Sequence, residues 1–228
     1  INVQHHKNSH VFSPSVNLAY DDLCSPASLK SNKLDRICCI VSTKAFLAGH
    51  RVRLSLANQL ATSPAGKYMD FYGGLDESFS DKFDVQSRYK YSLVLENTIL
   101  AHYWSEKLAD TFVASSFPFY LGCPNIDQYF HQDSMALLNG MPPALVSERL
   151  CSAIKEDLYA SRISELEASR LAVLNQYNVF NEMARLVSLP ASTKKCIRLR
   201  PNAYFTETHL QRVRRRISLA KRFFQSTL

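Results

Sequence analysis

The stretch "YKYSLVLENTILAHYWSEKLADTFVASSFPFYLGCPNIDQYF", residues 89–130, contains two short apolar runs separated by a polar loop and a helical pattern. The runs at 91–95 and 117–122 are typical of buried strands, and 102–115 has the apolar spacing of a helix. A strand, a helix and a second strand joined by short connections predict a parallel strand pair with a crossover helix.

The upstream sequence continues this alternation. Residues 35–44 and 68–74 predict two further strands, and 51–63 between them predicts a helix that ends before a proline and a glycine. We therefore expect an α/β fold, a Rossmann-like parallel sheet with flanking helices. Residues 142–187 carry apolar residues at helical intervals with few helix breakers, so one or two long helices should pack on this body.

Composition and charge divide the chain into three parts, although the 46% hydrophobic and 21% charged residues are those of an ordinary globular protein. Residues 1–34, rich in Asn, Ser, Pro and His, predict a linker or the end of an upstream domain. Residues 35–190 predict the α/β domain, and 191–228 a basic tail. Because the sequence begins at Ile1 rather than Met, we interpret it as a fragment or a processed product.

The net charge of +7 belongs to the tail, where 191–228 hold ten Lys and Arg against one Glu. Residues 196–206 predict an extended edge segment. Residues 209–228 space their apolar residues as an amphipathic helix with a basic face. Two interpretations of this helix stay open: it lies on an anionic membrane surface, or it packs its apolar stripe on the body. Nucleic-acid binding is not indicated, because the body is not basic.

The six cysteines show no CxxC pairing and no zinc-type spacing with histidine. Cys38 and Cys39 lie inside an apolar run, where free cysteine behaves as a small hydrophobic residue. We expect free thiols in a reducing compartment and no dedicated metal site.

Polar residues gather where the third predicted strand ends and the next helix starts. Ligands of parallel sheets bind at the carboxyl ends of the strands, and a helix start presents peptide N–H groups to anions. Lys107 in the first helical turn, with Arg53 on the helix after the first strand, would form a diphosphate site. Asn97 and Glu106 would then hold hydroxyls or the edge of a base.

An alternative interpretation of the same stretch is purely structural. Tyr103, Trp104, Leu108 and Phe112 would form the inner face of a helix, with Glu106 and Lys107 solvated outside. In that case Arg53 would be a surface residue that shields its own helix.

Three blocks resemble the family-10 glycosyltransferases, the α-1,3/1,4-fucosyltransferases, whose signature is Phe-Glu-Asn-Ser/Thr, then Tyr-Ile/Val-Thr-Glu-Lys-Leu/Ile, then Val/Ile-Pro-Val/Ile-Tyr-x-Gly-x-Pro. This chain reads Leu95-Glu96-Asn97-Thr98, Tyr103-Trp104-Ser105-Glu106-Lys107-Leu108 and Phe117-Pro118-Phe119-Tyr120-Leu121-Gly122-Cys123-Pro124. "ICCIVS", Arg53 with its following leucines and "MDFYGG" resemble further family blocks upstream, so the resemblance covers roughly residues 35–135. This chain departs from the family blocks at Thr43, Leu95, Trp104 and Ser105.

The resemblance implies that the domain is the C-terminal, donor-binding half of a two-domain GT-B enzyme that transfers L-fucose from GDP-fucose, with inversion, to a sugar hydroxyl of a glycan acceptor. Arg53 and Lys107 would neutralise the diphosphate, Asn97 and Tyr103 would line the phosphate and fucose side, and Glu106 would hold ribose hydroxyls. Glu96 is a further matched acid, with a structural role. Arg and Lys would replace a metal, so no cofactor is required.

The catalytic base of the family lies in its N-terminal, acceptor-binding domain, and no counterpart is present in this chain. We therefore expect the chain to bind the donor and to be inactive alone. The alternative is a non-catalytic nucleotide-sugar-binding or scaffold protein. The resemblance implies a cytoplasmic or peripheral-membrane location for a bacterial-type protein, or the Golgi lumen for a eukaryotic one.

Overall fold

The computed structural model describes residues 20–24, 32–43, 45–46, 48–73, 81–178 and the single positions 181, 184 and 188. The chain divides into two units, Ile1–Ser188 and Leu189–Leu228, and all described residues lie in the first. The predicted edge segment at 196–206 and the amphipathic helix at 209–228 lie outside the described residues and stay predictions.

The described part of the chain contains one sheet of five strands in the order β2-β1-β3-β4-β5, with every neighbouring pair parallel. Its strands are β1 (Leu34–Ile40), β2 (Met69–Tyr72), β3 (Tyr89–Leu95), β4 (Phe117–Leu121) and β5 (Ala136–Leu137). The predicted Rossmann-like parallel sheet is thus confirmed, as are the four predicted strands. The sequence missed β5, because two residues are too short to show a periodicity.

The described helices are α2 (Tyr20–Cys24), α3 (Ala48–Ala61), α4 (Lys82–Gln86), α5 (Glu106–Val113), α6 (Pro143–Lys155), α7 (Leu158–Ser161) and α8 (Ile163–Asn175), with 3₁₀ turns at Gly66–Tyr68, Ile126–Gln128 and Gln132–Ser134. The long helical pattern after 142 is divided into three helices, with Asp157 in a left-handed conformation (φ 46°) between the first two. The helix predicted from residue 102 begins only at Glu106, because His102 adopts φ 60° and Ser105 caps the helix.

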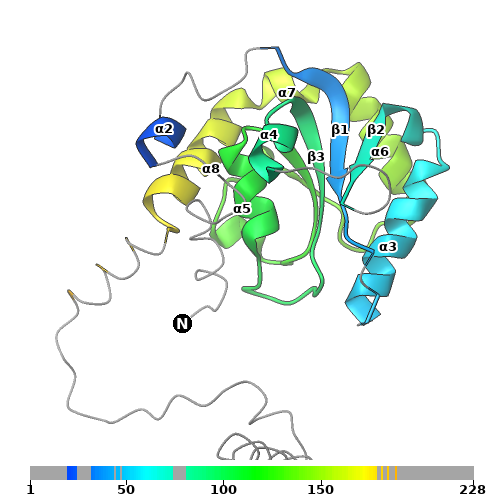
Figure 1. Cartoon of the computed structure of the whole chain (residues 1–228), viewed down its shortest axis with the longest axis horizontal. Coiled ribbons are helices and arrows are strands. Elements are labelled where there is room, and N and C mark those ends of the chain that lie inside the picture. Colours follow the sequence, from blue (N-terminus) through cyan, green and yellow to red (C-terminus); the bar gives the residue numbers. More distant parts are fainter. Residues whose placement is uncertain are drawn as a thin grey trace, which may run out of the picture. The chain divides into compact units, whose positions relative to one another are not determined.

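Helices cover both faces of the sheet, so the core has two layers. One cluster packs strand residues such as Leu93 and Phe119 against Leu60 of α3 and Leu150 of α6. The other packs residues of opposite strand parity, such as Val94, with side chains of α5 and α8. Figure 1 shows α3 and α6 on the right of the sheet and α5 and α8 on the left.

The strand order reverses between β1 and β3. From β1 the chain crosses to β2 on one side and then returns to β3 on the other side of β1. Crossovers that leave in opposite directions open a crevice at the carboxyl ends of the two strands, where open α/β sheets bind their ligands. The loops that follow β1 and β3 therefore define the position of a candidate site.

Candidate functional site

The first turn of α3 packs directly on the loop that follows β3. A Cβ built on Gly49 would lie 1.7 Å from the backbone oxygen of Asn97, so no larger residue fits without moving the loop. This contact brings the helix after β1 against Asn97, two residues beyond the end of β3. Sequence reasoning missed Gly49, because the predicted helix begins at residue 51 whereas α3 begins at Ala48 and includes this glycine in its first turn.

Arg53 follows Gly49 by one helical turn and is only 5% exposed. Its Nη2 donates to the backbone oxygen of Ser42 at 3.2 Å and to the Ser42 hydroxyl at 2.9 Å, at the carboxyl end of β1. Its buried Nε has no hydrogen-bond partner, and no carboxylate of the described residues forms an ion pair with the guanidinium.

A buried cation without a counter-charge is unfavourable, and burial lowers the pKa of Arg53 accordingly. The interpretation of Arg53 as a surface residue is wrong. Its unused donor and uncompensated charge suit an anion that approaches the crevice between β1 and β3.

Asn97 lies in the loop that follows β3, at the same crevice. Its Oδ1 is buried and has no hydrogen-bond partner within the described residues. An unsatisfied buried acceptor costs about 1–3 kcal/mol, so a ligand that donates a hydroxyl or amide hydrogen here would relieve that cost.

Glu96, which precedes Asn97, has no exposed side-chain surface. The Ser105 N–H donates to Glu96 Oε1 at 2.8 Å, and the Ser105 hydroxyl lies 2.8 and 2.7 Å from the two carboxylate oxygens. Burial raises the pKa of Glu96, and this effect exceeds the lowering by Lys107 and by the hydrogen bonds from Ser105. The carboxylate therefore anchors the N-cap residue of α5.

Lys107 occupies the first turn of α5 with its side chain 21% exposed. Its Nζ lies 3.5 Å from Glu96 Oε2, 3.3 Å from Glu106 Oε1 and 3.2 Å from the Ser105 hydroxyl. Burial lowers the pKa of Lys107, but Glu96 and Glu106 together outweigh burial and leave the pKa raised. The ammonium therefore lies between two carboxylates.

Tyr103 and Glu106 complete the predicted set. Tyr103 is half-buried, and its N–H donates to the Leu100 oxygen at 3.1 Å. The structural alternative is confirmed for Leu108 and Phe112, which are fully buried on α5. Trp104 is also fully buried but precedes the helix, and Tyr103 is only half-buried. The structural alternative is wrong for Lys107 as a freely solvated residue, because its partly exposed ammonium lies between two carboxylates.

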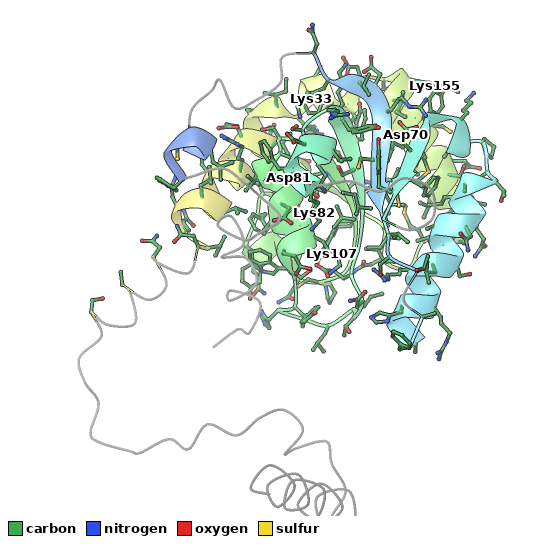
Figure 2. The ribbon with its side chains drawn as sticks, viewed as in Figure 1. Lys33, Asp70, Asp81, Lys82, Lys107 and Lys155 are labelled. Carbon is green, nitrogen blue, oxygen red and sulfur yellow. The ribbon has the colours of Figure 1, made fainter. Side chains whose placement is uncertain are left out.

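The structure thus places Arg53 at the end of β1 and the other four predicted residues at the end of the adjacent β3. In Figure 2, Lys107 lies toward this lower end of the sheet, whereas Lys33 and Lys155 lie toward the opposite end. That Arg53 and Lys107 contact one ligand stays a prediction. Sequence reasoning missed the anchoring of Ser105 by Glu96, although a serine directly before a helix is a recognised capping signal.

Two cavities lie along α3, one at each end. A cavity of about 470 Å³ at the carboxyl edge is lined mainly by apolar residues, among them Val52, Ile99, Leu121 and Met141. A second cavity of about 570 Å³ lies between the far end of α3 and α6. Neither is lined by the predicted site residues, so the candidate site is defined by its charges and unsatisfied atoms.

Among the described residues, no group of three or more His, Cys, Asp and Glu side chains is arranged to hold a metal ion. In the same part of the chain, no helix has the length and apolar character that a membrane span requires.

Comparisons with known proteins point to one group. No protein-family model matches the chain. A stretch of 64 residues, 27% of this chain, is 39% identical to 12% of a fucosyltransferase-like protein of Arabidopsis thaliana. The crystal structure of an α1,3-fucosyltransferase with GDP-fucose is similar over 71% of this chain and 54% of its own, with 15% identity and a TM-score of 0.50. Another α1,3-fucosyltransferase crystal structure is similar over 64% of this chain and 43% of its own, with 20% identity and a TM-score of 0.50.

These similarities confirm the predicted α/β fold and the predicted resemblance to fucosyltransferases. The chain spans about half the length of the solved structures that it matches, and the plant match covers about an eighth of that protein.

Proposed function

We propose that residues 35–190 are the donor-binding domain of a fucosyltransferase-type glycosyltransferase and bind GDP-fucose between the carboxyl ends of β1 and β3. The observation that carries this proposal is the buried guanidinium of Arg53, which has an unused Nε–H and no carboxylate partner among the described residues. The pyrophosphate of a nucleotide sugar would supply the missing negative charge. Support comes from the fucosyltransferase-like plant relative and from the solved structure that contains GDP-fucose.

The diphosphate would lie between Arg53 and Lys107. Arg53 would donate from Nε, and Lys107 would turn from its two carboxylates toward a phosphate oxygen. Hydrogen bonds to charged groups contribute about 1.5–3 kcal/mol each, so these two contacts would supply much of the affinity.

The remaining residues would orient the nucleoside and the sugar. Asn97 would accept a hydrogen bond through its unsatisfied Oδ1, and Tyr103 would line the phosphate and fucose side. Glu106, at the start of α5, would accept hydrogen bonds from ribose hydroxyls. Stabilising the departing GDP accelerates inverting transfer, because negative charge builds on the leaving phosphate in the transition state. The base that activates the acceptor hydroxyl would come from outside this chain.

Calorimetric titration of the chain with GDP and with GDP-fucose tests the binding step. We expect both ligands to bind, and Arg53→Met to raise the dissociation constant for GDP at least about 10-fold. Arg51→Met is the matched control: Arg51 is an exposed arginine two residues earlier on α3, and its replacement should leave binding unchanged.

A folded wild-type chain that binds no GDP would refute the proposal. So would equal affinities of the Arg53→Met and Arg51→Met variants. A scaffold protein without the base would bind GDP equally well, so transfer of fucose by the full-length parent protein distinguishes the enzyme from that alternative.

A further inference from the structure

A glycine and a carboxylate are fitted together at the end of β3. A Cβ on Gly122 would lie 2.7 Å from Glu96 Cγ and 2.4 Å from the Tyr120 hydroxyl oxygen, so only glycine leaves room for the Glu96 side chain. A buried carboxylate is costly unless it accepts hydrogen bonds or faces a cation. Glu96 does both, through Ser105 and Lys107.

The ion pair formed by Lys107 is loose. Its Nζ lies 3.5 Å from Glu96 and 3.3 Å from Glu106, whereas charge-assisted N–H···O bonds are typically about 2.7–2.9 Å long. The buried pair of Lys82 with Asp110, which joins α4 to α5, has such a short contact of 2.7 Å. Lys107 is therefore held near its carboxylates without the tight geometry of a structural pair.

We propose that Glu96 is a positioning residue of the donor site: its carboxylate fixes the first turn of α5 through Ser105 and holds the Lys107 ammonium loosely at the crevice, from where Lys107 turns to the diphosphate. This inference rests on the proposed function. It assigns Glu96 more than the structural role that the sequence indicates, because the carboxylate controls a group that contacts the ligand.

Binding of the diphosphate should also change the protonation of Glu96. When Lys107 turns away, the buried carboxylate faces a new anion and loses its counter-charge, so its protonated form becomes more favourable. The other charged or titratable groups around it are Glu106 on α5, Tyr103 before α5, and Tyr120 and Cys123 on β4 and its loop. The raised pKa of Glu96 agrees with this arrangement. GDP binding should take up a proton and strengthen as the pH falls.

Two substitutions of Glu96 separate its role as hydrogen-bond acceptor for Ser105 from the role of its negative charge. Glu96→Ala removes the acceptor for Ser105, and we expect it to weaken GDP binding about 10-fold near pH 7. Glu96→Gln keeps an acceptor oxygen, and its affinity should stay within about 3-fold of wild type. The ratio of wild-type to Glu96→Gln affinity should rise from about pH 8 to about pH 5. GDP itself ionises in this range, but it does so identically for every variant.

Asp110→Asn is the matched control, since Asp110 of α5 is the buried acid of a different acid–lysine pair, formed with Lys82 of α4. It should keep the wild-type affinity and pH profile. The proposal is overturned if Glu96→Ala binds GDP as tightly as wild type, or if the ratio of wild-type to Glu96→Gln affinity does not change with pH.

A measurement without ligand separates this inference from the proposed function. Nuclear magnetic resonance titration of ¹³C-dimethylated lysines, with the Lys107 signal assigned by its absence in Lys107→Arg, reports the pKa of Lys107 directly. We expect Glu96→Gln to lower that pKa and Asp110→Asn to leave it unchanged. A Lys107 pKa that is insensitive to Glu96→Gln overturns the positioning role even in a chain that binds no GDP.

Discussion

The ends of β1 and β3 each present one cation, in opposite electrostatic settings. Arg53, at the end of β1, is buried with no carboxylate partner among the described residues, whereas Lys107, beside the end of β3, faces two carboxylates. Positive charge is therefore in excess around Arg53, whereas the charge of Lys107 is compensated by its two carboxylates. The difference indicates that Arg53 supplies the standing attraction for an anion, and that Lys107 supplies a contact that forms only when the ligand competes with Glu96 and Glu106.

The largest expected effect concerns the contact between Gly49 of α3 and the loop after β3. In Gly49→Ala the new methyl group would meet the Asn97 backbone oxygen, so α3 or the loop after β3 must move. We expect a loss of about 3 kcal/mol or more in the free energy of unfolding, measured by urea denaturation. Ala57→Gly, at a buried position of the same helix, should cost less, about 1 kcal/mol from backbone propensity plus its lost methyl contacts. A Gly49→Ala protein as stable as wild type would show that α3 and the loop after β3 are not in contact.

Removing the compensated cation should harm the fold. Lys107→Met leaves Glu96 and Glu106 without their ammonium, and we expect the free energy of unfolding to fall by about 1–2 kcal/mol, less than for a fully buried pair because Lys107 is partly exposed. GDP affinity should also fall about 10-fold. An unchanged stability together with unchanged GDP affinity would remove Lys107 from both roles.

Removing the uncompensated cation, Arg53, should weaken GDP binding without lowering the free energy of unfolding. Arg53→Met abolishes a buried unpaired charge, so the free energy of unfolding should stay constant or rise by up to about 1 kcal/mol while GDP binding weakens at least about 10-fold. Denaturation and calorimetry on one preparation check both quantities. A loss of stability larger than about 1 kcal/mol would mean that the bonds of Arg53 to Ser42 matter more than its unpaired charge.

The smallest effect is a pH dependence of stability. Burial raises the pKa of Glu96 above its ordinary value of 4.5. Between 4.5 and the raised value, the native protein binds more protons than the unfolded chain, so the free energy of unfolding falls as the pH rises. Wild type should therefore gain stability relative to Glu96→Gln as the pH is lowered from about 7 toward 4.5, by denaturant midpoints. A constant difference would contradict the raised pKa.

The alternation of apolar runs was sufficient to predict the sheet, because the buried parts of the strands, such as residues 37–39 and 93–95, are apolar in this chain. It could not predict β5, which has two residues, nor the start of α5, which is set by the backbone of His102 and the cap of Ser105. Four of the five site residues, Arg53, Asn97, Glu106 and Lys107, came from their place beside the strand ends, and Tyr103 came from the family resemblance. Which of the two cations has carboxylate partners could not be predicted, because residue type alone does not show that Lys107 faces Glu96 and Glu106 while Arg53 faces no carboxylate of the described residues.

Trp104, the sole tryptophan of the chain, is fully buried directly before Ser105, with its ring centroid 5.0 Å from that of Phe130 and 5.5 Å from that of Tyr177. Indole emission on excitation near the red edge of its absorption therefore originates from a single place, next to the cap of α5. The molecule carries an intrinsic optical probe for nucleotide titrations, and no dye needs to be attached.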